Sequence, residues 1–156
     1  MSLPTILRPG EGRSVKIGNT TRCTFKVTGA DTQGHFGLFE YAMAAGTEGA
    51  RPHLHKRLTE MFYVVEGEIE LLLEQRRVMA SPGTFMRVPQ GTPHGFSNPS
   101  PRRSKLLILF CPADSREGYF EGLAELTRDG RQPTHEELVE LMRKFDQYLV
   151  PGPSPV

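Results

Sequence analysis

The sequence predicts an all-β domain followed by two amphipathic helices. From residue 14 to residue 112, short runs of β-branched, aromatic and aliphatic residues alternate with Gly and Pro, the pattern of β-sandwiches and barrels. After Pro112 the apolar residues recur at helical spacing instead. A length of 156 residues fits one domain that can bury a core of its own.

Nine runs of this composition are predicted as strands, at residues 14–17, 22–27, 36–43, 60–65, 68–73, 78–80, 84–88, 94–97 and 105–110. The turns between them have identifiable chemistry. Residues 81–84 place Pro and Gly at the central positions of a type II turn, and residues 88–91 suit a type I turn with Gly last. Gly67 interrupts a long strand-like run and predicts a bulge or bend.

Two helices are expected after the strands. Apolar residues repeat at helical spacing from Tyr119 to Leu126 and again from Leu138 to Leu149. Thr134, with a glutamate three residues on, predicts the capping box of the second helix. The predicted organisation is a β domain at 1–112, a helical extension packed on it at 113–150, and a flexible tail at 151–156. We expect the extension to cover apolar surface first, and to act as a lid or dimer contact second.

Composition restricts the functional class. Cys23 and Cys111 form no CxxC pair, which fits a reducing cytoplasm, although a single bridge between them stays open. No signal peptide and no run of membrane-spanning length is evident, so we expect no membrane partner. The formal net charge is +1 and the basic clusters are short, which argues against nucleic acid. Phosphate loops, GxSxG elbows and dinucleotide fingerprints are missing from the sequence.

Two spaced motifs carry the chemistry. Their fixed positions are His53, His55, Glu60 and Gly67 in the first, and Gly83, Pro89, Gly91, His94 and Asn98 in the second. Residues two apart on a strand share a face, so the first two histidines project together. Folding must then bring in the carboxylate and the third imidazole. Three imidazoles and one carboxylate suit a divalent transition metal. The other two histidines, His35 and His135, lie in a Gly-rich turn and near a helix start, and we expect both to face solvent.

These motifs resemble those of the cupins. The first is similar to the cupin HxH-(3 or 4)-E-(6)-G element, and the second matches G-(5)-PxG-(2)-H-(3)-N at every fixed position. The resemblance covers residues 36–112. It implies a single cupin β-barrel, a double-stranded β-helix or jelly roll, with the two helices at its C-terminal end. It further implies that the metal ligands are His53, His55, Glu60 and His94, and that the protein is a homodimer. The metal itself, Fe, Mn, Ni, Cu or Zn, is left open.

Pocket residues follow from strand alternation. Positions two beyond a ligand share its inward face, which nominates Phe62 and Phe96 as pocket lining, whereas Val64 is expected in the core. Tyr41 is a candidate for polar orientation of the substrate. A flat aromatic small molecule would suit such walls.

The resemblance favours a metal-dependent dioxygenase similar to quercetin 2,3-dioxygenase, acting on a small aromatic or enolisable substrate. Glu60 would be its catalytic residue, either as a ligand throughout or as a general base. Two alternatives stay open: a metal-dependent isomerase or cyclase that works by proton transfer, and a non-catalytic small-molecule sensor. No fold by itself decides among these functions.

Overall fold

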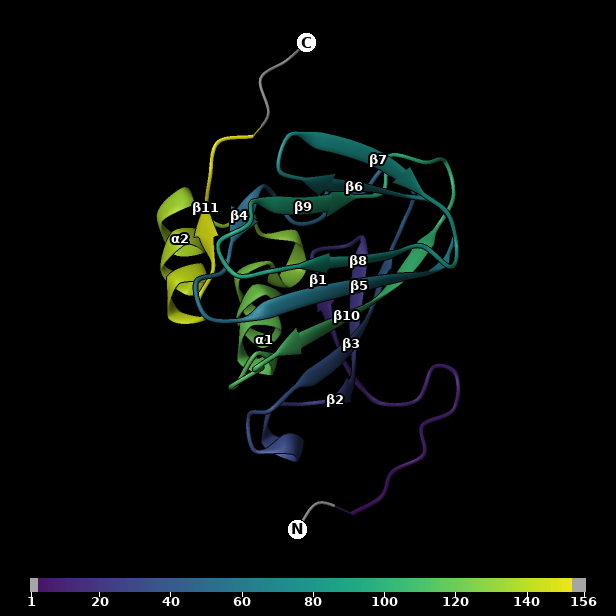
Figure 1. Ribbon diagram of the computed structural model, residues 1–156, viewed down its shortest axis with the longest axis vertical. Coiled ribbons are helices and arrows are strands. Elements are labelled where there is room, and N and C mark those ends of the chain that lie inside the picture. The colour runs from purple at the N-terminus through teal and green to yellow at the C-terminus, as the bar shows by residue number, and fades with distance from the viewer. Residues whose placement is uncertain (1–2, 153–156) are drawn as a thin grey trace.

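A computed structural model describes residues 3–152, so most of the tail predicted at 151–156 lies outside the described residues. Two antiparallel sheets face each other as a jelly roll, and two helices pack at one end of them (Figure 1). The first sheet has six strands in the order β1-β2-β3-β10-β5-β8. Their bounds are Arg13–Ile17 for β1, Thr21–Val27 for β2, Gly37–Met43 for β3, Ser104–Cys111 for β10, Thr59–Glu66 for β5 and Phe85–Val88 for β8.

The second sheet has five strands in the order β11-β4-β9-β6-β7. Their bounds are Tyr148–Leu149 for β11, His53–Leu54 for β4, His94–Ser97 for β9, Ile69–Leu73 for β6 and Arg76–Ala80 for β7. Two 3-10 turns, η1 at Ala30–Thr32 and η2 at Arg128–Gly130, lie in the connections.

The all-β fold class is confirmed, and each of the nine predicted strands is present with ends shifted by two residues at most. In β3 and β10 every second residue is buried, as expected of strands with one face on a core. Two strands were not predicted, β4 and β11. Each has two residues, which is too short to form a recognisable run, and they pair with each other although more than 90 residues lie between them.

Gly67 marks the point where the chain passes from one sheet to the other. It follows β5 of the first sheet and precedes β6 of the second, so the predicted bend is a crossing between sheets. Its φ of 72° is left-handed, and a Cβ at this position would lie 2.4 Å from the Arg103 carbonyl oxygen. Both conditions require glycine.

The turn predicted at residues 88–91 is shifted by one residue. Its hydrogen bond runs from the Thr92 N–H to the Pro89 carbonyl at 3.3 Å, and Gly91 has a φ of 76°. Gly91 therefore occupies the third position, where a type II turn demands a positive φ, and the type I prediction is wrong. The freed Gly91 N–H donates to the His55 carbonyl at 2.7 Å, which ties this turn to the segment after β4.

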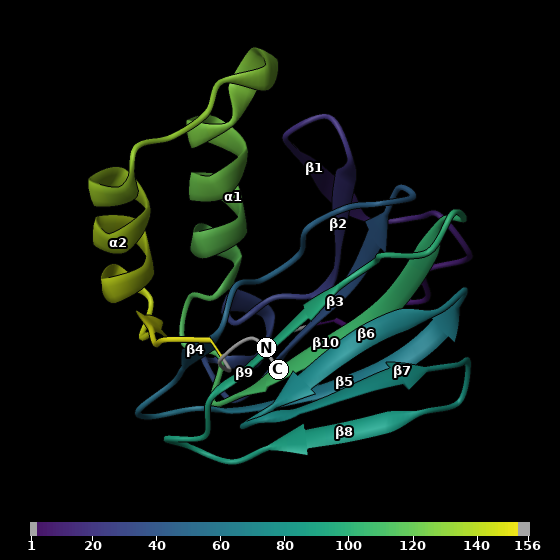
Figure 2. The same ribbon diagram turned by 90° about the horizontal axis from the view of Figure 1, so that it is seen from above.

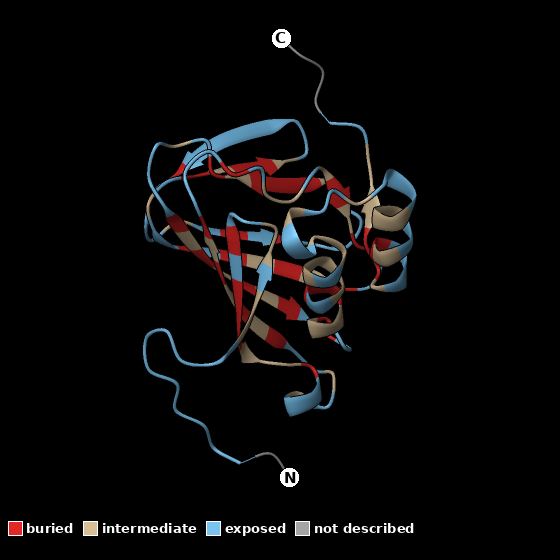
Figure 3. Cartoon of the chain, turned by 180° about the vertical axis from the view of Figure 1, so that it is seen from behind, coloured by how far each residue is buried: buried red, intermediate tan, exposed pale blue. Residues whose placement is uncertain are grey.

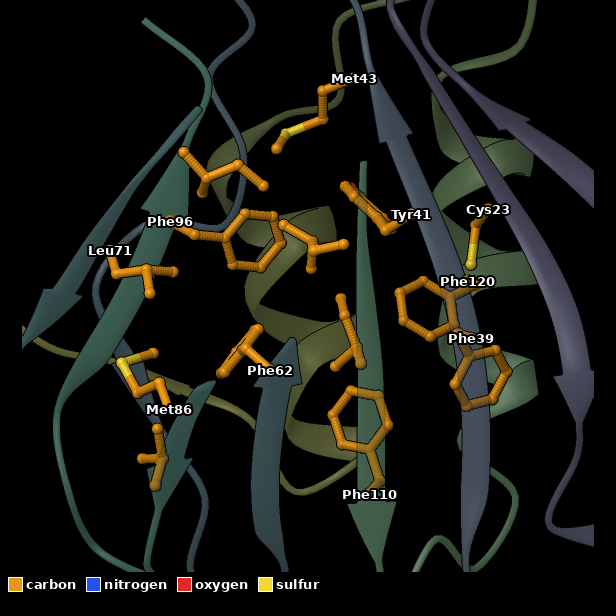
Figure 4. Close-up of a cluster of buried hydrophobic side chains, with 14 of the residues drawn as sticks. Cys23, Phe39, Tyr41, Met43, Phe62, Leu71, Met86, Phe96, Phe110 and Phe120 are labelled. Atoms are coloured by element: carbon orange, nitrogen blue, oxygen red, sulfur yellow. The ribbon is translucent and has the colours of Figure 1, made fainter. Parts of the chain in front are cut away.

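The core lies between the facing sides of the sheets. Buried segments gather on the inner strands, whereas β7 is largely exposed at an edge (Figure 3). Phe62, Phe96, Leu71 and Met86 project toward one another in the interior (Figure 4). Cys23 is buried within the same core cluster and Cys111 is exposed; both are free thiols, so the bridge that the sequence left open does not form.

The helical extension contains α1, Glu117–Leu126, and α2, His135–Lys144. The capping box at Thr134 is present as predicted. The second helix ends at Lys144, however, five residues before the apolar repeat does. Asp146 adopts a left-handed φ of 57°, which no helix can contain, and the chain then pairs with β4 as β11. None of the helices in the described part of the chain is long and apolar enough to cross a membrane.

Helix α1 closes the end of the core on the side of β1 (Figure 2). Its Phe120 side chain packs against the Phe39 ring at a centroid distance of 4.8 Å and against the Phe110 ring at 6.1 Å. Both ring pairs are tilted, and aromatic contacts of this kind stabilise a core beyond the area that they bury.

We expect Phe120→Ala to lower the free energy of unfolding by about 3–5 kcal/mol, the usual cost of removing a buried aromatic ring. The measurement is urea denaturation followed by circular dichroism. Thr134→Ala is the comparison, since loss of its cap should cost about 1 kcal/mol. A smaller loss for Phe120→Ala than for Thr134→Ala would show that α1 does not hold the core closed.

Candidate metal centre

Four polar side chains meet in the interior where the two sheets approach each other. His53 and His94 face each other on the paired strands β4 and β9 of the second sheet. His55 lies just after β4, and Glu60 comes from β5 of the first sheet. All four are buried, and one ligand atom from each lies within 4.8 Å of the others. The structure thus brings together the four residues that the motifs nominated.

Glu60 is the centre of this cluster. Its Oε2 lies 2.6 Å from His94 Nε2, 2.8 Å from His55 Nε2 and 3.8 Å from His53 Nε2. Burial alone would raise the pKa of Glu60, but the charge of His94 and the hydrogen bonds from the imidazoles hold it well below its ordinary value. Burial lowers the pKa of His53 to about 4. A carboxylate and a neutral imidazole are the forms that bind a metal.

Backbone carbonyls orient all three imidazoles. The Nδ1 atoms of His53, His55 and His94 lie 2.7, 2.6 and 2.9 Å from the carbonyl oxygens of Arg51, Asp146 and Thr92. A carbonyl can only accept, so each Nδ1 donates its proton and each Nε2 is turned toward Glu60. The Glu60 carboxylate also only accepts, so the Nε2 atoms of His55 and His94 donate to it, and a metal would bind in place of these protons. Metal-ligating histidines are oriented in this way, and three nitrogens with one carboxylate oxygen fit a divalent transition metal.

Asp146 supports this cluster and was not foreseen from the sequence. Its carbonyl accepts from His55, and its carboxylate accepts from the backbone N–H groups of Lys56 at 3.1 Å and Arg57 at 2.8 Å. One residue at the end of α2 therefore fixes both the ring of His55 and the backbone that follows it. The only sequence signal is that aspartate tolerates the left-handed conformation better than most residues.

The remaining fixed positions of the motifs are structural. The Asn98 amide donates to the carbonyls of Ala44 at 2.9 Å and Arg102 at 2.8 Å, and its oxygen accepts from the Ser100 N–H. It therefore holds two loops rather than a ligand. Gly83 and Gly91 supply positive φ angles in turns.

A cavity of about 240 Å³ opens onto the cluster between the jelly roll and the helical extension. His53 and Glu60 form part of its wall, and so do Tyr41 and Phe96, whose rings meet edge to face at 5.4 Å. Helices α1 and α2 and the segments at their ends cover the other side with Arg116, Tyr119, Phe120, Leu123, Leu138, Met142 and Gln147.

Phe62 does not belong to this wall. It is buried behind the cluster, with its ring 5.9 Å from that of His94 and 5.5 Å from that of Phe96. Inward alternation placed it correctly in the interior, but the prediction that it lines the pocket is wrong, because it is not among the residues that line the cavity. Val64 is in the core, as expected. His35 and His135 are exposed and outside the cluster.

Comparison with known proteins agrees with this geometry. The protein-family model of the Cupin domain matches residues 39–110. The chain is 34% identical over 102 residues to quercetin 2,3-dioxygenase of Bacillus subtilis (strain 168), an alignment covering 64% of this chain. It spans only 29% of that relative's length.

Solved structures share the fold. KdgF from Halomonas sp. superposes with a TM-score of 0.60 at 23% identity, over 69% of this chain and 94% of that one. The polyketide cyclase RemF from Streptomyces resistomycificus gives a TM-score of 0.60 at 21% identity, over 70% and 80%. At these identities the likeness concerns the fold alone.

We expect Asp146→Ala to weaken metal binding about 10- to 100-fold, the usual effect of removing the support of a ligand. The measurement is Co²⁺ titration followed by visible absorption. Asp129→Ala is the matched control, because Asp129 is also a left-handed aspartate, with a φ of 55°, but is exposed and outside the cluster. The backbone carbonyl that accepts from His55 is retained in alanine, so equal affinity in the Asp146→Ala and Asp129→Ala proteins would mean that the Asp146 carboxylate does not hold the segment after His55 in place.

Proposed function

Starting from the cupin domain that residues 39–110 form, we propose that this chain is a metal-dependent dioxygenase acting on a small aromatic or enolisable substrate. The ligands in this proposal are His53, His55, Glu60 and His94. The observation that carries it is the convergence of three Nε2 atoms and one carboxylate oxygen beside a cavity. Similarity to quercetin 2,3-dioxygenase supports the reaction class.

The residues of the chain have separate tasks in this reaction. A metal held by the four side chains would supply a Lewis acid that binds an enolate or catecholate oxygen and activates the substrate toward dioxygen. The three backbone carbonyls keep the imidazoles turned toward it. Glu60 Oε2 can accept the proton of a substrate hydroxyl. The edge-to-face rings of Tyr41 and Phe96 give a flat substrate an apolar wall.

Oxygen uptake tests the proposal. The protein is loaded separately with iron, manganese, nickel and copper and is given a panel of flavonols and catechols. We expect uptake that matches substrate consumption for at least one metal, and a loss of at least about 100-fold in His94→Ala, because a missing ligand removes the metal that carries the chemistry. His135→Ala, which changes an exposed histidine outside the cluster, should retain full activity. Uptake that is absent with every metal would overturn the dioxygenase reading.

The alternatives give different results in the same assay. An isomerase or cyclase would consume substrate without oxygen. A sensor would retain a ligand through purification and turn nothing over. Both would use the same cavity, so only the products separate them.

We also propose that the protein is a cytoplasmic homodimer. Cys23 and Cys111 are free thiols, in keeping with a reducing compartment. Tyr63 and Phe85 lie opposite each other on β5 and the edge strand β8, and both are about half exposed, which leaves an apolar surface that a second copy could cover.

A further inference from the structure

Arg116 is a buried cation on the wall of the cavity. It directly precedes α1, outside the residues that match the Cupin domain, and only 3% of its surface is exposed. Its guanidinium stacks on the rings of Tyr119 at 4.1 Å and Phe110 at 4.5 Å. It lines the same cavity as His53 and Glu60. An arginine that served only solubility would be on the surface.

The Arg116 guanidinium has more N–H donors than there are acceptors around it. Nη1 donates to the Phe145 carbonyl at 2.9 Å and Nη2 donates to the Gln147 side-chain oxygen, whereas Nε has no hydrogen-bond partner in the described structure. Among the described residues, no carboxylate lies within 4.0 Å of it. A buried charge without a counterion is costly, and natural proteins keep such charges mainly where something else neutralises them.

Tyr119 adds a second donor at the same place. Its hydroxyl accepts from the Gln147 amide at 3.1 Å, and its own hydrogen has no acceptor among the described residues. Tyr119 also lines the cavity. Gln147 therefore holds both side chains, with its oxygen on Arg116 and its nitrogen on Tyr119.

The charge of the cavity favours an anion. A divalent metal with neutral imidazoles and one carboxylate carries a formal charge of about +1, and Arg116 raises the total to about +2. The carboxylate counted here is that of Glu60. A negatively charged ligand complements this net positive charge, whereas a neutral ligand leaves the guanidinium without a counterion.

We propose that Arg116 and Tyr119 form a subsite for the carboxylate of a small organic acid. The proposal rests on the proposed function in one respect: if the chain is a dioxygenase, the acid bound here is its substrate. The enol or phenol end of that acid would then point toward His53 and Glu60. The planar guanidinium fork suits a carboxylate. A cavity of about 240 Å³ is smaller than the pockets that enclose drug-sized ligands, about 300–1,000 Å³, so the acid is a compact one.

Benzoate and benzamide are the probes, since they share a shape and differ in charge. Binding is measured by calorimetry on zinc-loaded protein, which has no redox chemistry. We expect benzoate to bind at least about tenfold more tightly than benzamide, and Arg116→Met to abolish that preference. Tyr119→Phe should weaken benzoate severalfold and leave benzamide unchanged. Arg131→Met is the matched control: Arg131 lines the same cavity, but Glu137 already pairs with its guanidinium at 2.6 Å, so the preference should persist.

Two results would overturn the subsite. One is equal binding of benzoate and benzamide by the parent protein, and the other is a preference for benzoate that survives in Arg116→Met. If inorganic phosphate binds more tightly than benzoate and its binding depends on Arg116 in the same way, the carboxylate proposal is overturned and the subsite is one for phosphate. If Arg116→Met unfolds, Arg116→Lys and Tyr119→Phe decide. The lysine should retain only part of the preference and Tyr119→Phe should reduce it, and a full preference in both variants would contradict the subsite.

The binding test is independent of turnover. A preference for benzoate without oxygen uptake in any metal form would support the subsite and contradict the dioxygenase proposal. Oxygen uptake without a preference for benzoate would support the dioxygenase proposal and contradict the subsite.

Discussion

Three hydrogen bonds from imidazole Nδ1 atoms to backbone carbonyls determine what this interior can do. Without them a buried cluster of three histidines could settle in several tautomers, and its nitrogens would not share one target. Because the carbonyl oxygens of Arg51, Thr92 and Asp146 accept from the Nδ1 atoms, every Nε2 is turned toward Glu60. The cost of burying a carboxylate is then met by the imidazoles around it. The three Nε2 atoms and the carboxylate are therefore gathered at one place, as a metal site requires.

Two of these carbonyls belong to the jelly roll and the third does not. Arg51 and Thr92 each lie two residues before the histidine that they orient, so local chain geometry is sufficient for them. Asp146 lies 91 residues from His55, at the turn between α2 and β11. The pairing of β11 with β4 fixes this turn against the cluster. The helical extension is thus a structural part of the metal centre, and not only a cover over apolar surface.

Sequence reasoning recovered what repeats locally and missed what depends on distant contacts. Runs of β-branched, aromatic and aliphatic residues between turn signals predicted the nine longer strands, and fixed spacing nominated the four residues that the structure brings together. The strands β4 and β11 have two residues each, which is too few to show a pattern of apolar residues. The apolar repeat of α2 continues past the end of the helix, because the chain turns at Asp146, whose conformation is left-handed. Arg116 was missed for a similar reason. A single arginine before a helix resembles a surface residue, and only the packing of Phe110 and Tyr119 around it reveals that it is buried.

The division of the cavity explains why the fold alone does not name the reaction. The jelly roll contributes the ligands together with Tyr41 and Phe96, and these suit many substrates. The opposite wall comes from the extension, and it holds the buried cation Arg116, which in our proposal selects among them. A relative could keep the motifs and the metal and still bind a different molecule, since its own terminal segment would form this wall. In the proposal made above, substrate choice would depend on Arg116 and Tyr119, which follow β10, whereas the four candidate metal ligands all lie before it.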